Sequence, residues 1–215
     1  MLGLPRASLA TALAAALLIL SSCSQPANSP AGDISTVKAN ESSQSSQLVT
    51  AKTAYWEMYK SASKWAPDLV LLRLVPKDEV SLQQNVGKAP IWEGTFGSAA
   101  KHECRVFTYA TAAHAPDVFA GVSVGNAMPW SGPVRDVMPI AISEISIDSD
   151  AAYTAAASDG AAWLKKNAEK KLTHFQLGNG YSFPAPVWYV MWGDEKSGYV
   201  AYINATTGTV LKKKK

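Results

Sequence analysis

Two short motifs recur in this chain of 215 residues at nearly the same spacing, and this recurrence constrains the fold most strongly. One motif is the dipeptide Ala54-Tyr55, which returns as Ala152-Tyr153 at an offset of 98 residues. The other is the segment 89–92 (APIW), which returns as 185–188 (APVW) at an offset of 96 residues. Because a single register relates both pairs, the sequence predicts an internal duplication.

In the first half the pattern predicts a helix over residues 51–65, where apolar side chains recur at helical spacing. Thr50 is its expected N-cap, and Pro67 ends it because the residue before proline avoids the α region. Strands are expected at 69–75, 91–96, 104–111 and 118–124, with a hairpin turn around Gly97-Ser98.

In the second half a helix is expected to start at Ser149 as N-cap and to run towards Lys171. Asp148 and Asp150 flank this start, where they favour the positive end of the helix dipole. Gly160 is a weak point of the helix, costing up to about 1 kcal/mol. Strands are expected at 172–177, 187–192, 199–204 and 209–211, and Gly208 is free to take a positive φ.

These elements define the expected fold class. We expect an α+β protein of two similar units, each a helix packed on a small antiparallel sheet. The units are residues 50–134 and residues 135–215. About 160 residues can bury roughly two thirds of their unfolded surface, which is enough for a hydrophobic core.

The second half also resembles a known family. A helix that opens with Ser, Asp and Ala, then 186–190 (PVWYV) and 198–211 (GYVAYINATTGTVL), are similar to a PepSY or PepSY-like domain over residues 145–211. That family commonly has Asp where this chain has Asn204, and an Asn side chain can still make the Asx-type turn bond. Residues 50–134 carry a weaker version without the Thr-Gly turn. The resemblance implies an envelope protein that binds or restrains peptidases, with no catalytic residues.

The N-terminal segment predicts where the protein resides. An apolar run over residues 9–20 is too short for a bilayer, which needs about 20 apolar residues, and it fits a secretory signal. The run leads through two serines to Cys23, which resembles a bacterial lipoprotein signal. The resemblance implies cleavage after residue 22 and a lipid on the Cys23 thiol, so residues 1–22 are the expected signal peptide. The alternative is a plain signal peptide with an incidental cysteine.

Residues 23–49 follow as a flexible tether, because they are rich in Ser, Asn, Gln, Pro and Ala and hold few large apolar side chains. Ser24 stands where an Asp would mark inner-membrane retention in enterobacteria. By that resemblance, the protein is expected on the outer membrane, facing the periplasm, rather than on the inner membrane. The net charge of +3, with four lysines at 212–215, is no nucleic-acid footprint. That lysine tail is expected to be a solvated terminus, or to touch anionic lipid.

Reactive side chains are few and have structural explanations. His102 and Cys104 would share one face of a strand, where parallel side chains seldom form a nucleophile–base pair. Cys104 has no partner once Cys23 carries lipid, so we expect no disulfide. The three histidines lack metal-ligand spacing, so no metal and no cofactor are expected.

The tryptophans are the remaining candidates for contact with a partner. Trp188 and Trp192 share one face of an expected strand whose two faces are both apolar, so they either pack inside the protein or form a binding surface. Packing is the favoured interpretation. Trp130, in a loop rich in Pro and Gly, is the best single candidate for an exposed contact.

Together these features predict a non-enzymatic envelope lipoprotein, anchored at Cys23, that binds a protein or peptide partner, and the PepSY-like resemblance implies that this partner is a peptidase whose activity it modulates. One alternative is a structural or assembly lipoprotein that links membrane and cell wall. A second and weaker alternative is an enzyme that uses Cys104.

Overall fold

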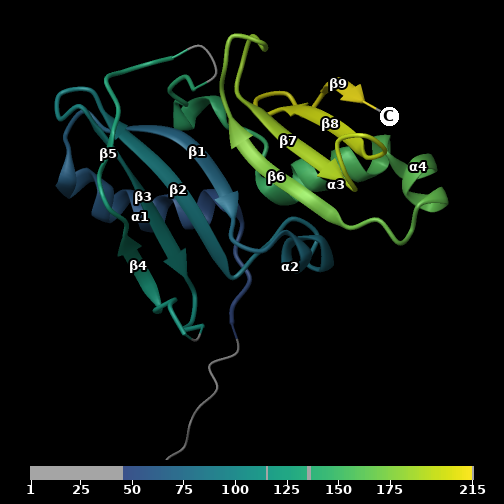
Figure 1. Cartoon of the computed structure of the whole chain (residues 1–215), viewed down its shortest axis with the longest axis horizontal. Helices are drawn as coiled ribbons and strands as arrows, with labels where there is room; N and C mark the ends of the chain where they lie inside the picture. Colours follow the sequence, from purple (N-terminus) through teal and green to yellow (C-terminus); the bar gives the residue numbers. More distant parts are fainter. Residues whose placement is uncertain (1–45, 115, 135–136, 215) are drawn as a thin grey trace, which may run out of the picture. The chain divides into compact units, whose positions relative to one another are not determined.

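A nine-stranded antiparallel sheet is the centre of the computed structural model, which describes residues 46–114, 116–134 and 137–214 (Figure 1). The sheet order is β4-β3-β2-β1-β6-β7-β8-β9, and β5 pairs with β3 beside β4. Cys23 and residues 24–45 of the predicted tether lie outside the described residues, as does the predicted signal peptide. The tether prediction is wrong at its C-terminal end, because Val49 is buried and pairs with Ala89 in a β-bridge. The described residues belong to one compact unit.

The first half supplies one end of this sheet. Its elements are α1 (Ala51–Trp65), β1 (Val70–Pro76), α2 (Glu79–Gln84), β2 (Ile91–Ser98), β3 (Glu103–Ala110), β4 (Gly121–Val124) and β5 (Met128–Pro129). The helix predicted at 51–65 is confirmed, and Ala66 leaves it in an extended conformation because Pro67 follows. The hairpin turn lies at residues 99–102, not at Gly97-Ser98, which belong to β2.

The second half supplies the other end. Its elements are the 3₁₀ helix η1 (Ile142–Glu144), α3 (Ser149–Asp159), α4 (Ala161–Lys166), β6 (Leu172–Gly178), β7 (Val187–Trp192), β8 (Tyr199–Asn204) and β9 (Val210–Lys214). The single helix predicted here is interrupted at Gly160. A Cβ at Gly160 would lie 2.7 Å from the Tyr199 ring, so glycine lets the chain approach the sheet closely at this break.

The expectation of two separate small sheets is wrong, because the two halves share one continuous sheet. β1 and β6 pair through Arg73 with Gly178 and through Leu74 with Leu177. Each half alone would present an unpaired inner strand, and pairing β1 with β6 satisfies the polar backbone groups of both edges. The class itself, α+β, is confirmed.

Both long helices cover the same face of this sheet (Figure 1). α1 packs on β1, β2 and β3, while α3 packs on β7 and β8. Leu74 and Leu177 face each other across the junction, so one core continues beneath both helices. We call this side the helix face and the opposite side of the sheet the open face.

The first turns of α1 and α3 meet, and side chains at the start of α3 cap α1. Ser149 is the first residue of α3 rather than its N-cap, which is Asp148. The buried Ser149 Oγ accepts a hydrogen bond from the Ala51 amide of α1 at 3.0 Å. Asp148 Oδ1 accepts from the Lys52 amide at 3.0 Å and from the Ser149 amide at 2.7 Å. Thr50 occupies the N-cap position of α1, but the capping oxygens come from the other half of the chain.

Candidate functional site

The open face carries two adjoining cavities near the junction of β1 and β6. The first has a volume of about 330 Å³ and lies over β1, β2 and β3. The second, of about 330 Å³, lies over β6, β7 and β8. Gln176, Gly178 and Asn179 line both. We call the two cavities together the open-face groove.

Trp130 covers the β2 side of this groove. A Cβ at Gly97 would lie 2.7 Å from the Trp130 ring, so the glycine makes room for the indole on the open face. The Trp130 amide donates to the His102 carbonyl oxygen at 3.0 Å, which fixes the loop against the β2–β3 turn. Val134 and Val137 continue the apolar wall. Trp130 thus lies at the candidate site, partly exposed, as a lining residue rather than a protruding contact.

Aromatic side chains line the opposite end of the groove. Tyr189 and Tyr202 stack with ring centroids 5.2 Å apart, and Phe183 lies 4.7 Å from Tyr202. Burial raises the pKa of Tyr189, so its hydroxyl stays neutral at physiological pH. The sequence did not single out Tyr189, Tyr202 or Phe183 as candidate site residues. It did predict that Tyr189 lies on the strand face opposite Trp188, because successive side chains of a strand point to opposite faces.

A β-bulge in β1 positions a cation in the middle of the groove. The pairing with β2 shifts register between Leu71 and Arg73, so Leu72 and Arg73 both line the first cavity. Bulges commonly re-aim side chains in this way. Arg73 is exposed, and no hydrogen bond or ion pair joins its side chain to another of the described residues. The cavity wall therefore presents a positive charge that no acidic side chain among residues 46–114, 116–134 and 137–214 pairs with.

Trp188 and Trp192 lie on the helix face, with 0% and 1% of their surface exposed. The Trp188 Nε1–H donates to the Ile147 carbonyl oxygen at 2.9 Å, and the Trp192 ring packs against Tyr153 of α3. Both side chains are core groups, in agreement with the packing interpretation. The alternative, that they form a binding surface, is wrong for this conformation because a partner cannot reach them.

Cys104 and His102 do not lie side by side on one strand, although the sequence predicts that they do. His102 lies in the turn before β3 with a φ of 54°, while Cys104 is within the strand, so they do not share a strand face. Cys104 is a free, buried thiol, and burial raises its pKa. Within residues 46–114, 116–134 and 137–214, no three His, Cys, Asp or Glu side chains group as a metal site.

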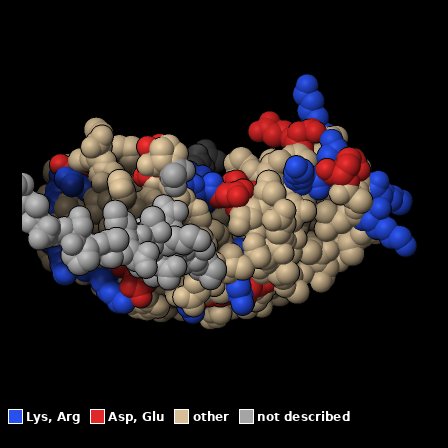
Figure 2. Space-filling model, turned by 90° about the horizontal axis from the view of Figure 1, so that it is seen from below, with Lys and Arg blue, Asp and Glu red and all other residues tan. Residues whose placement is uncertain are grey.

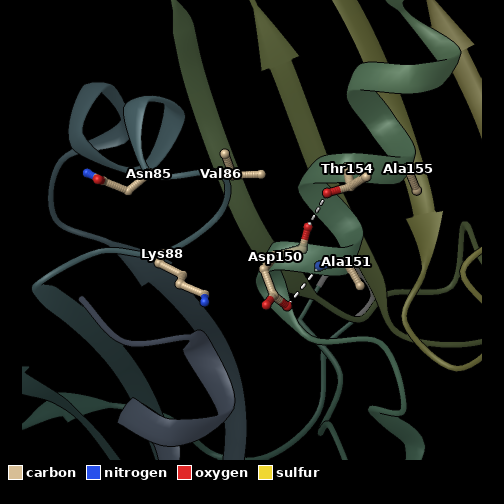
Figure 3. A pocket seen from close by; sticks show the side chains of 7 residues that line it. All are labelled: Asn85, Val86, Lys88, Asp150, Ala151, Thr154 and Ala155. Atoms are coloured by element: carbon tan, nitrogen blue, oxygen red, sulfur yellow. Dashed lines mark hydrogen bonds between the residues drawn. The ribbon is translucent and has the colours of Figure 1, made fainter.

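A larger cavity, of about 600 Å³, lies between the α2–β2 turn and the start of α3 (Figure 3). Figure 3 shows Lys88 of the turn on one side and Asp150 and Thr154 of α3 on the other. The polar atoms of the α3 wall already serve the helix, since Asp150 Oδ1 accepts from the Ala151 amide and Thr154 Oγ1 donates to the Asp150 carbonyl oxygen. We therefore consider the open-face groove the stronger candidate site.

Charged side chains of both signs gather at the end of the described unit that carries α4 (Figure 2). Charged side chains of both signs also lie in the middle and at the other end of the same view, between uncharged areas. This interspersed pattern differs from the single-sign surface of a nucleic-acid binding protein, in keeping with the small net charge.

Fold and site define an α+β protein with one helix-covered sheet face and an aromatic groove on the other. The chain is similar in structure to a crystal structure of a "putative lipoprotein" from Clostridium difficile 630, at 9% sequence identity and a TM-score of 0.45. The similarity covers 75% of this chain and 91% of that chain. At this identity and score the likeness defines neither a family nor a function for the chain.

Comparison with family models gave no match. Comparison with curated proteins also gave no match. Among the described residues, no helix combines the length and apolar character that crossing a bilayer requires.

Proposed function

We propose that this protein is a non-enzymatic bacterial envelope lipoprotein that binds an extended peptide segment of a partner protein in the open-face groove. The single observation that carries the proposal is the groove itself, with a stacked aromatic pair at one end and, in the middle, an arginine that has no ion-pair partner among the described residues. Aromatic and arginine side chains are the groups most often dominant in binding surfaces.

The dimensions of the groove favour an extended segment over a compact ligand. The second cavity lies over β6, β7 and β8 and the first lies over β1, β2 and β3. Neighbouring strands lie about 4.8 Å apart, so six neighbouring strands span about 24 Å across the sheet. This length accommodates about seven residues of extended chain at 3.3 Å per residue.

The anchor is the second part of the proposal. The chain would be lipidated at Cys23 and tethered through residues 24–45 to the outer membrane, with the folded unit in the periplasm. The support is the signal-like sequence of residues 1–22, which ends in two serines directly before Cys23. Labelling cells with an alkyne-bearing fatty acid tests it: the full chain should be labelled, a Cys23→Ala variant should not, and membrane fractionation should show which membrane holds the protein.

We also propose that the two halves are duplicated PepSY-like units. Trp92 Nε1–H donates to the Val49 carbonyl oxygen at 3.0 Å, and Trp188 Nε1–H donates to the Ile147 carbonyl oxygen at 2.9 Å. The donors are 96 residues apart and the acceptors 98, the same offsets as the sequence motifs. Asn204 Oδ1 also accepts from the Thr206 and Thr207 amides, as the expected Asx-type turn requires. A role in restraining a peptidase follows from the resemblance alone.

Peptide binding is the direct test of the groove. The full chain, purified in detergent micelles, is screened against a library of random ten-residue peptides. We expect selected peptides to bind at least about tenfold more weakly to a Tyr202→Ala variant, because this ring is half of the stacked pair. Phe119→Ala is the matched control, since Phe119 is 73% exposed and lines neither cavity of the groove. No selected peptide, or equal losses in both variants, would contradict the proposal.

A further inference from the structure

We infer that the peptide segment bound by the groove carries a carboxylate, which pairs with Arg73, about four residues from an apolar or aromatic side chain. This inference rests on the proposed function and adds the chemistry of the ligand. It follows from the charge of the groove wall, from the position of Arg73 in the sheet and from the distance between Arg73 and the stacked tyrosines.

Among the described residues that line the groove, Arg73 alone is charged. The others are apolar, aromatic, amide, hydroxyl, thiol or glycine residues. Glu93, a carboxylate on the neighbouring strand β2, pairs with Lys77 at 3.0 Å. The described lining of the groove is thus complementary to an anion and contains no acidic group of the kind that a cationic ligand would need. A carboxylate can accept two parallel hydrogen bonds from the planar guanidinium, which favours this anion chemistry in a peptide.

The β-bulge fixes where that anion is bound. Because Leu72 and Arg73 both line the cavity, the guanidinium is mounted on a strand rather than on a mobile loop. Gly178, the residue opposite Arg73 on β6, has no side chain that would cover the aliphatic stem of the arginine. The Gln176 amide lies in the same shared part of the groove and can contact the peptide backbone.

The spacing between the two ends of the groove predicts the pattern in the ligand. β1 carries Arg73, and β8, three strands away, carries Tyr202. Three strand spacings amount to about 14 Å, which an extended peptide covers in about four residues. The described residues that line the aromatic end, at Tyr202 and Phe183, carry no charge, so this end suits an apolar or aromatic side chain.

The experiment compares matched peptide libraries on the full chain in detergent micelles. One library allows Asp and Glu, a second replaces them by Asn and Gln, and both are made with a free C-terminal carboxylate and as C-terminal amides. We expect the selected peptides to lose about tenfold in affinity when their carboxylate is removed, the scale of one charge-assisted hydrogen bond. The two forms of each library distinguish an acidic side chain from a terminal carboxylate as the group that pairs with Arg73.

Variants of the protein complete the test. Arg73→Gln should abolish the preference for carboxylates while leaving neutral peptides bound, Arg73→Lys should restore part of it, and Lys101→Gln, in the exposed β2–β3 turn, should leave it unchanged. Neutral and acidic peptides binding equally well to the native chain would overturn this inference and leave the proposed function intact. No peptide binding at all would overturn both.

Discussion

Replacing Ser149 by alanine tests whether the second half of the chain caps the first helix of the first half. Ser149 is fully buried, and its hydroxyl oxygen accepts the hydrogen bond of the Ala51 amide at 3.0 Å across 98 residues of sequence. Its own helix is capped by Asp148 instead. The substitution therefore removes a cap from α1 while it leaves the capping contacts of α3 in place.

The expected cost follows from the geometry. Loss of the acceptor leaves a buried backbone N–H unpaired, which costs about 1–3 kcal/mol, and loss of a helix N-cap costs about 0.5–2 kcal/mol. These are two measures of the same bond, so we expect about 1.5 kcal/mol in total. In a unit of this size that corresponds to a fall of about 3–6 °C in the melting temperature.

Urea unfolding followed by tryptophan fluorescence measures the free energy, and amide hydrogen exchange by NMR localises the effect. Exchange should accelerate at Ala51 and in the first turn of α1 more than in α3. Ser158→Ala is the matched control, because Ser158 is an exposed serine within α3. If Ser149→Ala costs no more than Ser158→Ala, or if α3 rather than α1 loosens, the capping of α1 by Ser149 is wrong.

Three further predictions use the same unfolding assay or simple chemistry. Trp188→Phe should lower the free energy of unfolding by about 1–3 kcal/mol, since it leaves the Ile147 carbonyl without its indole donor, and Trp92→Phe should cost less, because the Val49 carbonyl also accepts from the Ala89 amide at 3.0 Å; a larger cost for Trp92→Phe would contradict this account. Burial, and then the hydrogen bond to Asp159, raises the pKa of Tyr199 above its ordinary value of 10.0. The stability from neutral Tyr199 is therefore present below about pH 10 and lost as pH rises towards the folded pKa, and Tyr199→Phe should flatten this alkaline loss. Cys104, buried with a raised pKa, should react with iodoacetamide only in urea, and rapid reaction in the folded state would contradict that environment.

Local structure could be predicted from the sequence where side-chain pattern and turn chemistry agreed. The strands at 187–192 and 199–204 have the expected bounds, and Asn204 makes the expected turn bonds before Gly208, whose φ is 77°. The helix at 51–65 is also as expected. In each case the determining interactions lie within a few residues of one another, so periodicity and turn propensity carry enough information.

Contacts between the halves could not be predicted, because nothing local specifies them. α2, six residues long, is too short to show helical periodicity, and the Gln83 side chain accepts from the Leu172 amide 89 residues away. The capping of α1 by Ser149 likewise depends on a residue of the other half. The register of β1 against β6, which merges two sheets into one, rests on two residue pairs.

The groove could not be predicted from the sequence either, because it also depends on contacts that are not local. Its cation is placed by a bulge between Leu71 and Arg73, and a bulge leaves no mark on a strand's alternating pattern when both neighbours are apolar. Its shared centre, at Gln176 and Gly178, lies on β6 beside the junction with β1. Each half alone would expose β1 or β6 as an edge. The first cavity exists only in the joined sheet, because Gln176 and Gly178 of β6 line it together with Arg73 of β1, whereas the lining of the second cavity comes from the second half alone. Joining the two halves thus brings the arginine of the first half onto the same sheet face as the aromatic residues of the second half.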